Sequence, residues 1–113
     1  MQFKHAPQNI DDYATVWVCF HEHLISCLFA DLLESRGIPA KIVSGLIEHG
    51  QLPKIITEPR YFVALSPDQQ RHCLVVGTPE SLAPWRGNGT HTLSRPLSEE
   101  KIDTALAQLL SAH

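Results

Sequence analysis

The chain has 113 residues, of which 43% are hydrophobic and 19% are charged, and its formal net charge at pH 7 is −3. These values are typical of one soluble globular domain, and the length suffices to bury a core without disulfides or a structural metal. The negative charge and the scattered lysines and arginines disfavour binding to nucleic acid or to an anionic membrane surface.

Residues 15–44 carry the pattern of a β–α–β unit. The strand expected at 15–20 is apolar on both faces, which is typical of a central strand. Gly37 stands where a left-handed residue ends a helix, and the chain resumes as a strand at 40–44, where Lys41 suits a sheet edge. The helix expected over 22–36 has one wide apolar face, which we expect to cover the sheet. Its members are Leu24, Ile25, Leu28, Phe29, Leu32 and Leu33.

The middle of the chain is harder to assign. Residues 45–53 read as a turn or one helical turn, and the apolar run at 60–65 predicts a second central strand. The segment Ser66-Pro67-Asp68-Gln69 fits either a capped helix start or a type I turn. Because the run at 73–76 is rich in β-branched residues, we favour a hairpin that pairs 60–66 with 71–77.

The C-terminal third holds a long loop and a well-specified helix. The loop expected at 78–97 is rich in proline and glycine, with a short strand possible at 90–93. Ser98 fits the N-cap of the last helix, and the two glutamates after it suit the positive first turn. The apolar positions of this helix predict a buried stripe formed by Ile102, Ala105, Leu106, Leu109 and Leu110.

These elements predict an α+β fold, a plait in the order β-α-β-β-β-α. Two helices would pack on one face of a mostly antiparallel sheet. We expect a single domain over residues 1–113, with a flexible arm at 1–13.

The first half of the chain resembles a known family. The segments that carry the resemblance are Leu32-Leu33-Glu34-Ser35, Gly37-Ile38-Pro39-Ala40, Leu52-Pro53 and Val63 to Asp68. Over roughly residues 15–70 they are similar to a small bacterial family assigned to signal transduction, whose function is not established. The resemblance implies a ferredoxin-like or PII-like split β–α–β fold, and a binding or regulatory role. After Asp68 the chain departs from that family's pattern, which continues into a helix.

Two groups of residues are candidates for chemistry. His23, Cys27 and Asp31 fall at i, i+4 and i+8 on the predicted helix, close to His21. Two or three such ligands without a second ligand-rich segment rarely hold zinc, so we predict no metal site. A reactive thiol at Cys27 beside His23 is a weaker alternative, since no recognisable third group completes a triad.

The second candidate is the loop that contains Trp85 and Arg86. An aromatic ring and a guanidinium group on a flexible loop can close over an anionic or planar ligand. The alternative, which we favour, is a Gly-Asn-Gly turn with Trp85 packed on the domain. The sequence predicts neither a catalytic residue nor a cofactor.

Cysteine usage and sheet edges lead to the remaining predictions. The three cysteines, Cys19, Cys27 and Cys73, form no CxxC pair, which favours free thiols in the cytoplasm. No apolar run approaches the roughly 20 residues that span a bilayer, and the N-terminus lacks a secretion signal. Residues 72–77 have no assigned partner on one side, so we predict a homodimer interface at Leu74, Val75 and Val76.

The function that fits these patterns is a non-enzymatic cytoplasmic binding or regulatory module that acts as a homo-oligomer and has an unidentified small ligand. The alternative is a protein-interaction module, an accessory or inhibitor protein, without a small ligand. A small metal-dependent or thiol-dependent enzyme is the third hypothesis.

Overall fold

The computed structural model describes residues 15–45 and 53–111. The predicted arm at 1–13 and most of the predicted turn at 45–53 lie outside these ranges. The described strands form one five-stranded sheet in the order β2-β1-β3-β4-β5, and every pair of neighbours is parallel. They are β1 (Val16–Cys19), β2 (Ala40–Ile42), β3 (Lys54–Thr57), β4 (Cys73–Gly77) and β5 (His91–Ser94).

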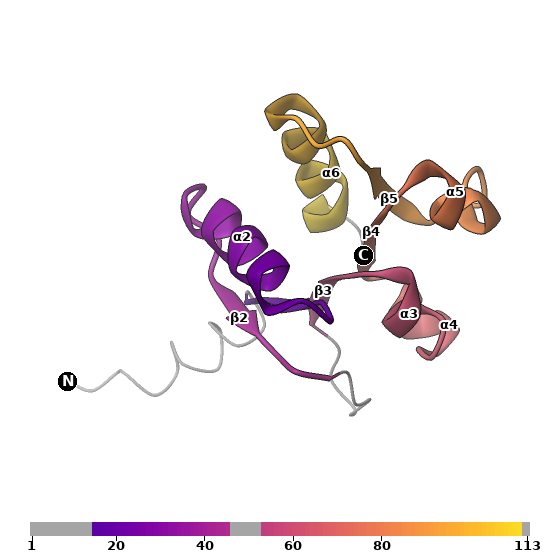
Figure 1. Ribbon diagram of the computed structural model, residues 1–113, viewed down its shortest axis with the longest axis horizontal. Coiled ribbons are helices and arrows are strands. Elements are labelled where there is room, and N and C mark those ends of the chain that lie inside the picture. Colours follow the sequence, from indigo (N-terminus) through magenta and orange to yellow (C-terminus); the bar gives the residue numbers. More distant parts are fainter. Residues whose placement is uncertain (1–14, 46–52, 112–113) are drawn as a thin grey trace.

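The fold class predicted from the sequence is therefore wrong. The chain is an α/β protein with a doubly wound parallel sheet, not an α+β plait with a mostly antiparallel sheet. Helices cover both faces of the sheet rather than one (Figure 1). Strand β1 lies between β2 and β3, so the chain passes from β1 to β2 on one side and returns to β3 on the other. The neighbouring strands β1 and β3 therefore form a topological switch point.

The predicted β–α–β unit is correct. Strand β1 is central, and β2 lies at the edge of the sheet, as Lys41 suggested. Helix α2 (His23–Glu34) connects them, and Gly37 follows it with a φ of 76°, the left-handed conformation that glycine adopts at little cost. The last helix, α6 (Glu99–Ser111), begins as predicted, since the Ser98 hydroxyl accepts a hydrogen bond from the Lys101 amide at 3.2 Å.

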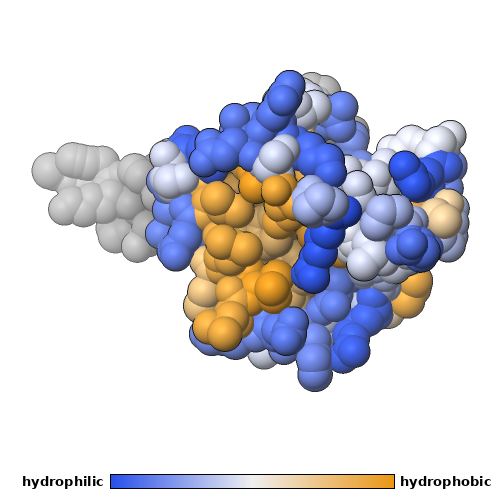
Figure 2. Space-filling view, turned by 45° about the horizontal axis from the view of Figure 1, so that its top comes forward, coloured by the Kyte–Doolittle hydropathy of each residue, from blue (hydrophilic) through white to orange (hydrophobic). Residues whose placement is uncertain are grey.

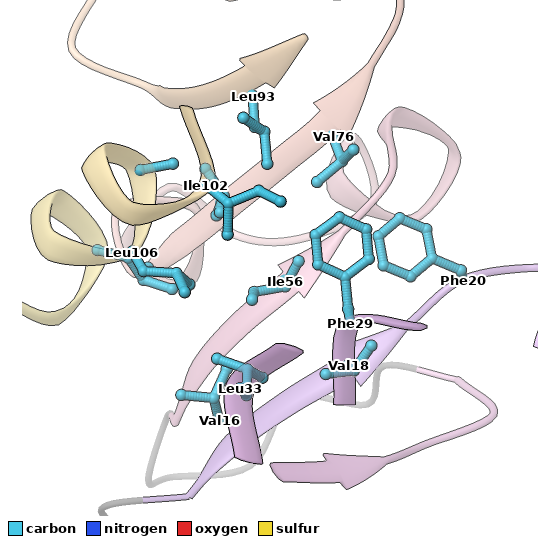
Figure 3. Close-up of a cluster of buried hydrophobic side chains, with 13 residues drawn as sticks. Val16, Val18, Phe20, Phe29, Leu33, Ile56, Val76, Leu93, Ile102 and Leu106 are labelled. Atoms are coloured by element: carbon cyan, nitrogen blue, oxygen red, sulfur yellow. The ribbon is translucent and has the colours of Figure 1, made fainter. Parts of the chain in front are cut away.

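Helices α2 and α6 cover the first face of the sheet and close the larger apolar cluster (Figure 3). The rings of Phe20 and Phe29 stack there with centroids 5.2 Å apart. At one end of the two helices, the Arg36 guanidinium lies 2.7 Å from the Asp103 carboxylate. The strand residues in this cluster alternate with those that face the other side, so Ile56 of β3 and Leu74 of β4 belong to it.

The second face is covered by short helices that the sequence analysis did not assign. They are α3 (Pro59–Phe62), α4 (Pro67–Gln70), α5 (Pro79–Leu82) and the 3-10 turn η1 (Ala83–Trp85). The three α-helices each begin with proline at the first turn, where the missing amide hydrogen leaves no bond unmade. Phe62, Leu65 and Leu82 bury their side chains against Ile55 and Val75 of the sheet.

The predicted strand at 60–65 and its hairpin with 71–77 are wrong. Residues 59–62 are helical, and β4 pairs in parallel with β3 on one side and β5 on the other. Of the two alternatives for residues 66–69, the helix start is correct, because the Ser66 hydroxyl accepts the Gln69 amide at 3.3 Å. A parallel connection needs a crossover of about a dozen residues, which residues 58–72 and 78–90 supply.

The buried face of α2 also differs from the predicted one. Ser26, Phe29 and Leu33 are buried, whereas Leu24 is 81% exposed and Leu28 is 45% exposed. Figure 2 shows a broad apolar area over this part of the molecule. Leu110 of α6, expected in the core, is exposed as well. In the part of the chain described, no helix is long and apolar enough to cross a membrane.

Candidate functional site

The carboxyl ends of parallel strands meet at one edge of the sheet, and in doubly wound sheets ligands bind there, beside the switch point. In this chain β1 ends at Cys19 and is followed by Phe20 and His21, which lead into α2. The neighbouring strand β3 ends at Thr57 and is followed by Glu58. Side chains from both connections therefore gather where the strand order reverses.

Three hydrogen bonds fix the backbone at this edge. The Thr57 hydroxyl donates to the Cys19 carbonyl at 2.7 Å and ties β3 to β1. The His21 amide donates to the Glu58 carboxylate across the same pair of strands. The buried Ser26 hydroxyl of α2 accepts the Phe20 amide at 3.1 Å. The turn from β1 into α2 is thus held from both sides, so its side chains have defined positions.

A cavity of about 500 Å³ opens at this edge. Its lining residues with polar side chains are His21, His23, Ser26, Ser44 and Tyr61. Its remaining lining residues are Phe20, Ile42 and Val43. The volume lies in the range of pockets that bind small molecules, and the lining combines an apolar wall with a few polar groups.

The predicted pair of His23 and Cys27 is close in space. The Cys27 sulfur lies 3.4 Å from Nε2 of His23, and the Cys27 side chain is partly exposed. The thiols of Cys19 and Cys73 are buried. Burial raises the pKa of Cys73 to about 12, and burial followed by the charge of Glu58 raises the pKa of Cys19. All three cysteines are free, as predicted, and Cys27 is the one that solvent reaches.

Trp85 and Arg86, the other predicted site residues, do not join this group. The Trp85 ring packs edge-on against Phe62, with centroids 5.2 Å apart, on the second face of the sheet. Arg86 borders a separate hollow of about 420 Å³ between α5, β5 and α6, where the Lys101 ammonium is already bonded to two backbone carbonyls. The predicted ligand-binding residues therefore lie in different parts of the fold.

The predicted interface residues are also placed differently from what we expected. Leu74, Val75 and Val76 lie in β4 and are at most 2% exposed. Both neighbouring strands pair with β4, so the premise of an unpaired side is wrong. In this fold these residues form the core of the sheet, and they are not available at the surface.

A metal site gains no support from the geometry. Within residues 15–45 and 53–111, no three His, Cys, Asp or Glu side chains come close enough to share an ion. Asp31 lies on the exposed side of α2, away from the cavity lining. Chemically, the edge can donate hydrogen bonds to a small ligand and can carry positive charge on its imidazoles.

The sequence analysis missed Tyr61 and Ser44 as site residues. The sequence analysis assigned Tyr61 to a strand, although Pro59 fits the first turn of a helix, where proline is common. Ser44 was assigned to the last position of the strand expected at 40–44, whereas β2 ends at Ile42, and a predicted antiparallel sheet gives the ends of its strands no common edge. Recognising Lys54–Thr57 as a strand would have brought the ends of β1, β2 and β3 together.

Comparisons with protein families, curated proteins and solved structures returned no match for this chain.

Proposed function

We propose that this protein is a non-enzymatic binding module of regulatory type, which takes a small ligand and acts in the cytoplasm as a homo-oligomer. The observation that carries the proposal is the cavity at the carboxyl edge beside the switch point. The free thiols suit a reducing compartment. The regulatory role follows the resemblance of residues 15–70 to a bacterial signalling family and stays a prediction.

Binding is favoured over catalysis by the kinds of groups that line the cavity. Its polar side chains are imidazoles and hydroxyls, and none of its lining residues is a carboxylic acid. General acid and base catalysis commonly relies on two titratable groups in contrasting environments. The thiol of Cys27 has an imidazole beside it but does not line the cavity.

A thermal-shift screen of nucleotides and small metabolites tests this proposal. A ligand at about 100 times its Kd adds about 2.7 kcal/mol to the free energy of unfolding and raises the Tm. We expect Ser44→Phe, which fills the carboxyl-edge cavity, to abolish the shift. Gln108→Phe, in the hollow beside β5, is the matched variant and should keep the shift. A shift lost in Gln108→Phe and kept in Ser44→Phe would place the ligand elsewhere.

The homo-oligomer in this proposal is supported by the outer side of α2. Leu24, Leu28 and Leu32 recur every four residues and form what we call the α2 stripe. Helix α2 thus buries one face in the domain and leaves two of these leucines exposed on another. Exposed apolar patches on soluble proteins commonly mark interfaces. We propose that a second copy of the chain covers the α2 stripe, in place of the interface predicted at β4.

Sedimentation at micromolar concentration tests this assignment. We expect a dimer for the wild type and a monomer for Leu24→Glu, because a buried carboxylate without a partner opposes association. Val63→Glu is the matched variant, since Val63 is 61% exposed at the end of α3, and it should remain dimeric. A monomeric wild type would contradict the proposed homo-oligomer. A dimeric Leu24→Glu would contradict the proposal that the α2 stripe is its interface.

A further inference from the structure

The carboxyl-edge cavity has an uneven distribution of charge-bearing groups. Of its lining side chains, those of His21 and His23 can take a positive charge near neutral pH, and none is a carboxylate. Ser44 and Tyr61, two further lining residues, carry hydroxyl groups, which can donate hydrogen bonds. The cavity therefore offers donors and positive charge, without a fixed negative charge to oppose a ligand of the same sign.

Two acidic residues, Glu22 and Glu58, flank the cavity without lining it. Glu58 follows β3 beside the cavity, but its carboxylate accepts the His21 amide and is not among the lining groups. Glu22 precedes α2, and its side chain makes no capping bond to that helix. Cys27, on the next turn of α2, contacts His23 through its sulfur.

The other wall of the cavity is apolar. Phe20 is buried with its ring stacked on Phe29, so it presents a fixed surface, and Val43 and the partly exposed Ile42 continue that wall. An apolar body placed on this wall gains by leaving water. An inorganic ion would leave the wall unused, and an uncharged apolar molecule would leave the imidazoles without an acceptor.

We propose that the ligand of this cavity is a small organic anion, a carboxylate or phosphate ester on an apolar or aromatic body, held by His21 and His23. This inference rests on the proposed function and adds the chemical class of the ligand. The anion lies at the imidazoles, and the apolar body lies on Phe20, Ile42 and Val43.

Titration calorimetry with two matched probes tests the inference. Benzoate carries a negative charge at neutral pH, and benzyl alcohol is its neutral counterpart. We expect the Kd for benzyl alcohol to be about tenfold higher than that for benzoate, because the neutral probe offers no anion to the imidazoles. His21→Gln with His23→Gln should remove this preference for benzoate, and His91→Gln, on β5, should retain it.

The outcomes separate this inference from the function on which it rests. Benzyl alcohol that binds as tightly as benzoate, or a preference for benzoate that survives His21→Gln with His23→Gln, overturns the anion and keeps the binding module. The anion is also overturned if neither probe binds and Ser44→Phe abolishes the thermal shift caused by a neutral compound of the screen. If no compound depends on the cavity, both proposals fall.

Discussion

The two faces of the sheet are covered in different ways. On the first face, α2 and α6 have 12 and 13 residues and close a cluster of 13 buried residues. On the second face, three helices of four residues each and a 3-10 turn close a cluster of six. Isolated helices of one turn are unstable in water, so the second face owes its order to tertiary packing and local caps. The two long helices of the first face also have a periodic apolar pattern in their own sequence.

The largest expected effect tests whether the two faces belong to one cooperative unit. Phe29→Ala on the first face and Phe62→Ala on the second each remove a ring that is at most 2% exposed. We expect each to lower the free energy of unfolding by about 3–5 kcal/mol in urea melts. A cost for Phe62→Ala below about 1 kcal/mol, with Phe29→Ala costly, would mean that the short-helix face folds separately.

The next prediction compares two sides of α2. Leu33 is fully buried in the first cluster, so Leu33→Ala should cost about 2–5 kcal/mol. Leu28 is 45% exposed, so Leu28→Ala should lower the free energy of unfolding of the monomer by about 1 kcal/mol or less. The melts are made at concentrations low enough to avoid self-association. Equal costs would show that the helix is rotated relative to the sheet.

The third prediction concerns alkaline pH and the second face. Because burial raises the folded-state pKa of Cys73 to about 12, the unfolded chain releases this proton first. The stabilisation is complete below about pH 8.5 and is lost as the pH rises toward 12, by about 1.4 kcal/mol per unit at most. Urea melts at pH 8 and pH 10 should differ accordingly, and Cys73→Ala should flatten the dependence. An unchanged slope in Cys73→Ala would assign the effect to other groups.

The smallest effects come from the helix caps. Ser66→Ala removes the cap of α4, and Ser98→Ala removes that of α6, with amide-to-hydroxyl distances of 3.3 and 3.2 Å. We expect each to cost about 1 kcal/mol in thermal melts. If the short helices depend more on their caps than the long helices do, Ser66→Ala should lower the free energy of unfolding at least as much as Ser98→Ala. The reverse order would assign the stability of α4 mainly to its buried Gln69 and the packing around it.

The first face could be predicted from the sequence because its signals are long and redundant. The β1–α2–β2 unit combines an apolar strand, a periodic helix and Gly37 in sequence order. Ser98, the two glutamates and the apolar spacing specify α6 in the same way. The phase of α2 could not be fixed, since its leucines occupy two faces and only tertiary contacts select between them.

The second face could not be predicted because its helices are too short to show a period. The run at 60–65 is apolar at nearly every position, which fits a buried strand or a packed helical turn equally well. That single misassignment hid β3 and reversed the expected direction of β4. Without parallel strands the sequence analysis could not recognise the common carboxyl edge. Of the residues that line the cavity, it therefore named only His21 and His23 as candidates.

The central claim is that a small ligand binds at the carboxyl edge of β1 and β2. The most direct measurement is a titration of ¹⁵N-labelled protein with the most stabilising compound of the thermal-shift screen, followed by amide chemical shifts. The claim predicts that the largest changes fall at residues 20–26, at 42–44 and at Tyr61. Changes concentrated at Arg86, Thr92 and Lys101 would place the ligand in the hollow beside β5 and contradict it.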